Sequence, residues 1–134
     1  MIFEYNLTIT AGRNRRSPAT QELQLARGII HKVEVIFPPG CHHQVFVVIR
    51  RGLNQVFPTN PDGQFKGNAF PISYPVWYPM EDGPFLLKAY GWAPLTTFAH
   101  TVTIRLGILP RAVLMPPSET VGVVNKIRDL LFGR

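Results

Sequence analysis

Alternation of apolar and polar residues is the feature that most constrains the fold of this chain. From residue 3 to 10, every odd position is apolar and every even position is polar. From residue 98 to 106, the even positions carry apolar residues or histidine, and the odd positions carry Ala, Thr or Arg. A period of two is that of a half-buried β-strand, whereas a helix would repeat every 3.6 residues. Both segments are therefore predicted to be strands.

Further strand candidates lie between these two segments and are separated by turn-forming residues. Leu23 and Leu25 flank a polar residue in a short candidate. Residues 29–37 place Ile29, Val33, Val35 and Phe37 on one predicted face. Residues 45–49 are apolar on both faces, which is typical of a central strand covered on each side. Residues 53–57 and 85–90 complete the set, and the segments PPG at 38–40 and PTNPDG at 58–63 are predicted turns.

The segment 64–84 has the weakest pattern. Four prolines recur with aromatic residues between them, so we expect an ordered, aromatic-rich excursion with short edge strands at most. The chain as a whole is predicted to be all-β, with seven or eight strands in an antiparallel sandwich or jelly roll.

The C-terminal segment has a different pattern. We assign residues 1–109 to the β-sandwich domain and residues 110–134 to a proline-rich linker and an amphipathic helix. Ser118 can cap this helix, in which Val123, Val124, Ile127, Leu130 and Leu131 share helical spacing. A helix of about 13 residues is marginal alone. It is expected to dock either on its own domain or, as an arm, on a neighbouring subunit.

Length and charge narrow the class of protein. A chain of 134 residues fits one domain that buries a core without disulfides, and its single cysteine excludes a disulfide framework. The start, MIFEYNLTIT, has no basic or unbroken apolar region, and no window is apolar enough to span a membrane. We therefore expect no secretory signal, no membrane span and synthesis in the cytoplasm.

No catalytic motif is present in the sequence. There is no nucleophile elbow, zinc-protease helix or phosphate-binding loop, and the acids fall mostly in predicted turns or on polar strand faces. Cys41, His42 and His43 are the one metal-like cluster, but neighbours on a strand point to opposite faces and rarely share an ion. We expect a non-enzymatic protein without metal or cofactor.

Two groups of residues are candidates for contact with other molecules. Arg13, Arg15 and Arg16 form a dense basic loop in a chain of net charge +6, suited to an acidic partner or to nucleic acid. Among the aromatic residues, Trp77, Tyr78 and Trp92 are the predicted contact residues, since Trp and Tyr are enriched at interfaces. The predicted arm would add Ile127, Leu130 and Leu131.

The build as a whole resembles virion accessory proteins of tailed phages. The features that carry this resemblance are the small β-sandwich, the basic N-terminal loop, the turns at Pro38–Gly40 and Asn60–Gly63, and an arm after Met115. Capsid decoration, cement and head–tail connection proteins share this outline. The resemblance implies a structural protein of the virion that assembles in several copies or on a shell protein.

Two other functions fit the same residues. A carbohydrate- or surface-binding module would use the tryptophans and remain a monomer. A nucleic-acid-binding protein would use Arg13, Arg15 and Arg16, and its affinity would fall steeply with salt.

Overall fold

The computed structural model describes residues 1–110 of the chain. Nine strands occur in this part: Ile2–Ile9 (β1), Ala19–Gln24 (β2), Gly28–Ile36 (β3), Phe46–Arg51 (β4), Asn54–Phe57 (β5), Phe65–Lys66 (β6), Pro71–Met80 (β7), Leu86–Trp92 (β8) and His100–Leu109 (β9). The prediction of an all-β fold is confirmed for these residues. The strands predicted around residues 3–10 and 98–106 are β1 and β9, and β9 ends just before Pro110.

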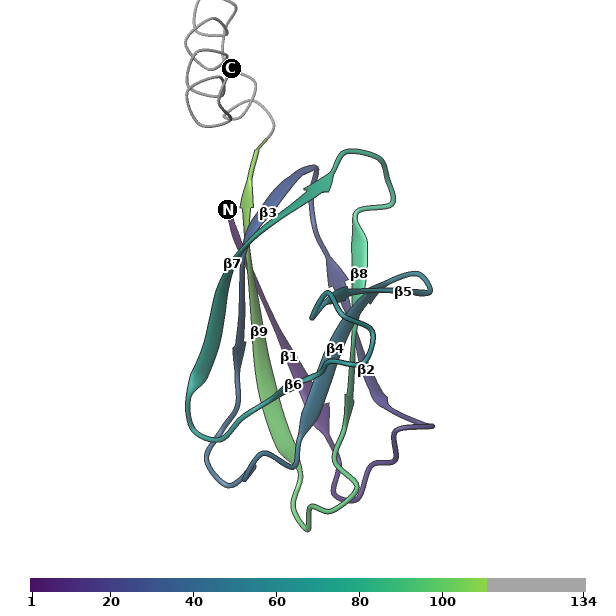
Figure 1. Ribbon diagram of the computed structural model, residues 1–134, viewed down its shortest axis with the longest axis vertical. Coiled ribbons are helices and arrows are strands. Elements are labelled where there is room, and N and C mark those ends of the chain that lie inside the picture. Colours follow the sequence, from purple (N-terminus) through teal and green to yellow (C-terminus); the bar gives the residue numbers. More distant parts are fainter. Residues whose placement is uncertain (111–134) are drawn as a thin grey trace, which may run out of the picture.

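The strands form two antiparallel sheets that face each other (Figure 1). One sheet has the order β1-β9-β3-β7, and the other has the order β2-β8-β4-β5, with β6 paired to β4. The pairing is nested, because β1 pairs with β9, β2 with β8, β3 with β7, and β4 with β5. The chain thus behaves as one long hairpin that is folded over into two layers.

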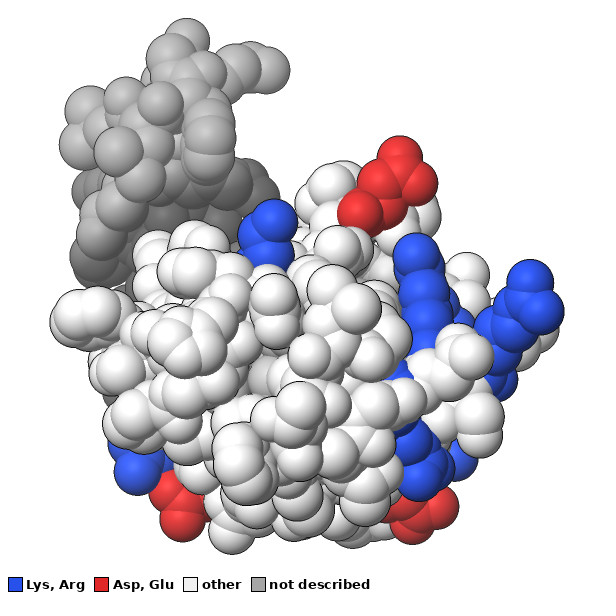
Figure 2. All heavy atoms as spheres, turned by 90° about the horizontal axis from the view of Figure 1, so that it is seen from below, with Lys and Arg blue, Asp and Glu red and all other residues white. Residues whose placement is uncertain are grey.

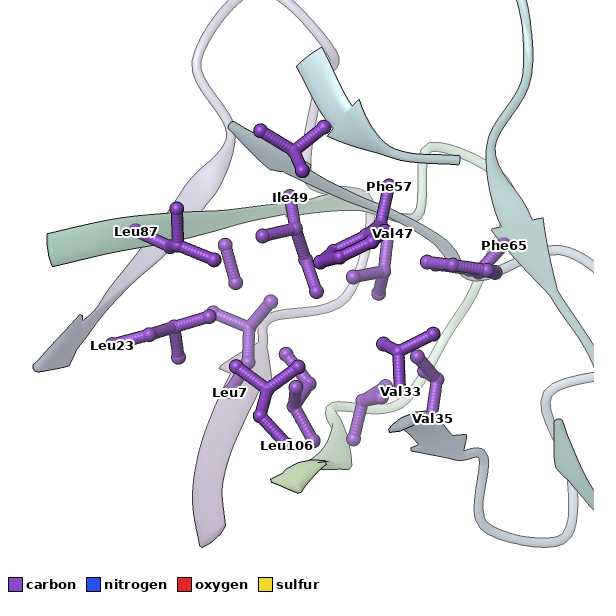
Figure 3. Packing of buried hydrophobic residues seen from close by; sticks show 14 of the residues in the cluster. Leu7, Leu23, Val33, Val35, Val47, Ile49, Phe57, Phe65, Leu87 and Leu106 are labelled. Carbon is purple, nitrogen blue, oxygen red and sulfur yellow. The ribbon is translucent and has the colours of Figure 1, made fainter. Parts of the chain in front are cut away.

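The core fills the space between the sheets (Figure 3). Alternate residues of each strand point inward, so β4 contributes Val47 and Ile49 from one layer, and β9 contributes Ile104 and Leu106 from the other. No polar or charged residue is buried within residues 1–110. This core is entirely apolar, and its stability comes from burial and close packing.

A β-bulge at His31 makes the prediction for one strand face wrong at Ile29. The pairing of β3 with β9 skips His31, because Ile30 lies opposite Ile108 and Lys32 lies opposite Gly107. One extra residue reverses the alternation of the strand. Ile30 is therefore fully buried and Ile29 only half-buried, whereas the sequence pattern put Ile29 on the inner face.

The segment 64–84 also differs from its prediction. It contains a ten-residue strand, β7, where short strands at most were expected. The location at a sheet edge is as predicted, since β7 pairs with β3 alone. Pro71 and Pro75 lie four residues apart on a regular stretch of the ladder, so with a period of two their missing N–H groups fall on the same side of the strand. The register with β3 then shifts between Pro75 and Tyr78, before Pro79. Proline on this edge strand interrupts the row of N–H donors that a further strand would need.

The predicted C-terminal helix lies outside the described residues. The same is true of Ile127, Leu130 and Leu131, the contact residues predicted for the arm.

Candidate interaction surfaces

Three strongly exposed aromatic residues lie on or next to β7. Trp77 is 63% exposed and Tyr74 is 50% exposed, and Phe70, just before the strand, is 75% exposed. The three prolines of β7 are exposed as well. Residues 67–80 contain no charged side chain, so we call Phe70, Tyr74, Trp77 and the three prolines the β7 strip. An uncharged aromatic strip of this kind marks an interaction surface more often than isolated apolar residues do.

Tyr78 differs from its neighbour Trp77. Its ring is half-buried and meets Phe57 of the opposite sheet edge-on, with ring centroids 5.9 Å apart. Arg51 donates to the Tyr78 hydroxyl at 3.5 Å and to the carbonyl oxygen of Asp82 at 2.6 Å. Tyr78 therefore closes the gap between the layers, and Trp77 points outward.

A cleft of ≈ 530 Å³ lies between β7 and the chain from β5 to β6. Rings of Phe57, Phe65 and Tyr74 line it, and Phe65 stacks on Tyr74 at 6.2 Å. Polar side chains from the 58–64 turn, including Asn60 and Gln64, complete the lining. Aromatic walls with a few polar groups are typical of small-ligand sites.

Trp92 lies on the outer face of the five-stranded sheet. It is 7% exposed, because Phe46 of β4 stacks on it at 5.9 Å and the guanidinium of Arg15 sits 5.1 Å from its ring centre. The structure therefore separates the predicted contact residues. Trp77 is open to a partner, whereas Trp92 is covered by its neighbours.

The basic loop is tied to the sheet in a way that the sequence did not indicate. Arg13 donates to the carbonyl oxygens of Ser17 and Pro18 at 2.7 and 3.3 Å, so its side chain holds the loop together. Arg15 lies over Trp92, and Arg16 is exposed. Figure 2 shows that Lys and Arg gather on one side of the molecule, the side of β2 and β8 in Figure 1.

The outer face of the four-stranded sheet carries a polar ladder. Arg105 of β9 bridges Glu4 at 2.6 Å and Glu34 at 3.1 Å, and its neighbour Thr103 donates to Asn6 at 2.9 Å. The hydrogen bond to Glu4, then that to Glu34, raises the pKa of Arg105. Glu4 and Glu34 are therefore paired with Arg105 on this sheet face.

Cys41, His42 and His43 lie in a turn, although a strand geometry was assumed for them. Cys41 is fully buried, and both histidines are exposed with positive φ angles of 49° and 60°. Within residues 1–110, no three His, Cys, Asp or Glu side chains come close enough to hold a metal ion.

The same part of the chain contains no helix of the length and hydropathy that a membrane span requires.

Sequence reasoning missed two cations that lie beside Tyr90, on the same sheet face as Trp92. Arg50 lies 5.2 Å and Lys88 5.8 Å from the ring centre of Tyr90. These residues come from β4 and β8, which are far apart in the sequence, and only the strand register brings them together. The one sequence signal for these two cations was their position within otherwise apolar strand segments.

Neither a protein-family model nor a curated protein matches this sequence. Among solved structures, the fold is similar to that of the Yersinia pseudotuberculosis-derived mitogen, with a TM-score of 0.44 and 9% identity over 81% of this chain and 86% of that chain. A structure described as "CBM4 structure and function" gives a TM-score of 0.37 and 13% identity over 80% and 70% of the two chains. A Bacillus endospore appendage protein from disulfide-linked pili gives 0.34 and 13% over 81% and 88%. Similarities this distant assign no family, and the protein is described by its own structure as a β-sandwich module.

Proposed function

We propose that this chain is a non-enzymatic assembly protein whose copies associate through the β7 strip. The observation that carries the proposal is the uncharged, aromatic surface along residues 70–79, with Trp77 63% exposed at its centre. Trp and Tyr are enriched among the residues that contribute most of the binding energy at interfaces.

Charge favours a second copy of this chain as the occupant. The protein has a net charge of +6, so two copies carry charge of the same sign and repel each other overall. Residues 67–80 carry no charge, and copies that meet there avoid close contact between cations. The prolines block pairing of backbones at the edge of β7. The contact is therefore made by side chains, in a symmetric, self-complementary interface.

The nested strand pairing supports a more specific description of the fold. The pairing of β1 to β4 with β9, β8, β7 and β5, with β6 as an addition, supports a jelly roll as the finer description of this sandwich. Jelly rolls are common in viral capsid proteins and in lectins. Together with the resemblance in outline to virion accessory proteins of tailed phages, this topology leads us to propose the virion as the place of assembly, with a shell protein as a further partner.

The solution mass of the purified protein, measured by light scattering at low and high salt, tests this proposal. We expect a mass above the 15.1 kDa of one chain that persists at high salt, because an apolar contact is not screened. Trp77→Ala should weaken association by about tenfold or more, as expected for a hot-spot residue.

Phe98→Ala is the matched control, since Phe98 is an aromatic in the loop before β9 that is 74% exposed, somewhat more than Trp77. It should leave the mass unchanged. A monomer at every concentration, or equal effects of the two substitutions, would contradict the proposal.

The cleft beside Tyr74 favours a second candidate, a carbohydrate-binding module. Its aromatic walls and the side chains of Asn60 and Gln64 suit a sugar ring and its hydroxyls. This candidate predicts a stable monomer whose glycan binding is lost on Tyr74→Ala. Binding to an array of glycans, measured on the monomer, distinguishes it from assembly.

A further inference from the structure

The outer face of the five-stranded sheet gathers cations from four separate segments. Arg15 comes from the loop before β2, Arg50 from β4, Lys66 from β6 and Lys88 from β8. Strand register places Phe46 opposite both Lys66 and Trp92, and Arg50 opposite Lys88. Because Val47 and Ile49 point into the core, Phe46, Val48 and Arg50 all point outward. We call Arg15, Arg50, Lys66 and Lys88 the basic face.

Among the residues that the structure describes, the cations of the basic face form no ion pair with an acid. Within residues 1–110, both ion pairs belong to Arg105 on the other sheet. Arg50 and Lys88 lie directly opposite each other on neighbouring strands, an arrangement of like charges that destabilises a sheet. Glu22 of β2 lies opposite Lys88 on the neighbouring strand, but the two side chains form no ion pair. An anion bound over this face would remove the repulsion.

Aromatic rings hold both arginines of the basic face in place. The guanidinium groups of Arg15 and Arg50 lie 5.1 and 5.2 Å from the ring centres of Trp92 and Tyr90. Contact with a ring orders the side chain before a ligand arrives and leaves N–H donors free along its edge. Less side-chain entropy is then lost when the guanidinium binds a phosphate.

We propose that the basic face binds the phosphodiester backbone of double-stranded nucleic acid. Phe46 and Arg50 are four positions apart and therefore about 13 Å apart along β4, at roughly 3.3 Å per residue. Lys66 and Arg15 at one end and Arg50 and Lys88 at the other thus lie far enough apart to meet several phosphates. A duplex offers one charge per about 1.7 Å of its axis, twice the density of a single strand.

The same residues argue against a platform for stacked bases. Single-strand binding of that kind needs open aromatic faces, and Trp92 is 7% exposed beneath Arg15 and Phe46. The contact is therefore expected to be made by charge and to be independent of base sequence. It is separate from the β7 strip, which lies on the other sheet.

Fluorescence anisotropy of a labelled DNA duplex, titrated with the full chain at several salt concentrations, tests the proposal. Four phosphate contacts predict a slope of log K against log salt near −3.6, or about a 100-fold loss of affinity between roughly 50 and 200 mM salt. Lys88→Gln should lower the affinity and reduce the magnitude of the slope by about 0.9. Lys32→Gln is the matched control, because it removes the same charge from an exposed position on the four-stranded sheet.

Three results would overturn the proposal. One is the absence of duplex binding at the lowest salt. Another is an equal loss of affinity in Lys88→Gln and Lys32→Gln, which would indicate diffuse attraction to net charge. The third is displacement of the duplex by poly-glutamate at equal charge, which would identify an acidic protein surface as the ligand. Urea unfolding of each variant confirms that it is folded, and solution mass tests the β7 strip independently.

Discussion

Gly91 of β8 packs directly against Ile9 of β1, so that the two sheets meet with no side chain between the Gly91 backbone and its neighbours. A Cβ atom added to Gly91 would lie 2.8 Å from Leu7 Cδ2 and closer still to Ile9 Cδ1. Both isoleucine and leucine are core residues. The distance between the layers at this point is therefore set by the absence of a side chain at residue 91.

Gly91→Ala should destabilise the protein by about 1–3 kcal/mol, the usual cost of overpacking a core. The measurement is the urea midpoint of unfolding. Ile9→Val in the same chain removes Cδ1 and should recover part of the loss. Gly83→Ala is the control, since a Cβ there would meet its nearest neighbour, Phe85, at 3.8 Å. Equal midpoints for the two alanine variants would show that the contact is not tight.

The bulge at His31 predicts opposite behaviour for two neighbouring isoleucines. Ile30 is fully buried, so Ile30→Ala should lower the free energy of unfolding by about 2–5 kcal/mol. Ile29 is half-buried, and Ile29→Ala should cost clearly less. Denaturant unfolding of both variants decides the matter. A larger loss at residue 29 would mean that the strand keeps an uninterrupted alternation.

The two tryptophans should separate stability from association. Trp92→Ala removes a ring packed on Phe46 and Arg15 and should cost about 3 kcal/mol, near the lower end for a buried Trp. Trp77→Ala should change stability by no more than about 0.5 kcal/mol, as for other exposed positions. Urea unfolding below the concentration at which copies associate is the measurement. A costly Trp77→Ala in the monomer would place that ring in the fold and not at an interface.

Cys41 should make stability depend on alkaline pH. Burial raises the pKa of the Cys41 thiol above its value in the unfolded chain. As the pH rises above about 8.5, the unfolded state loses the proton first, so the stabilisation present at lower pH is progressively lost. The free energy of unfolding of the wild type should fall between about pH 7 and pH 10 relative to that of Cys41→Ala, which lacks this group. If the free energies of unfolding of the wild type and of Cys41→Ala change in parallel with pH, the proposed effect of burying the thiol is contradicted.

Much of the fold follows from local pattern. The alternation at 3–10 and 98–106, the doubly apolar segment at 45–49 and the turns at 38–40 and 58–63 correspond to β1, β9, β4 and the loops between strands. These patterns are local because the side chains of a strand alternate whatever its partner. The exposure of Trp77 and its position on an edge strand were also within reach of the sequence.

Strand register and packing decided the rest. Which isoleucine of β3 enters the core depends on a bulge against β9, about 75 residues away in the sequence. Trp92 became a covered residue because β4 brought Phe46 beside it and the basic loop brought Arg15 over it. The sequence by itself determined that this chain forms antiparallel strands around an apolar core. Only the tertiary structure decided which aromatic rings stay open and which cations share a face, because those neighbours are chosen by pairing between distant segments, and residue type does not specify that pairing.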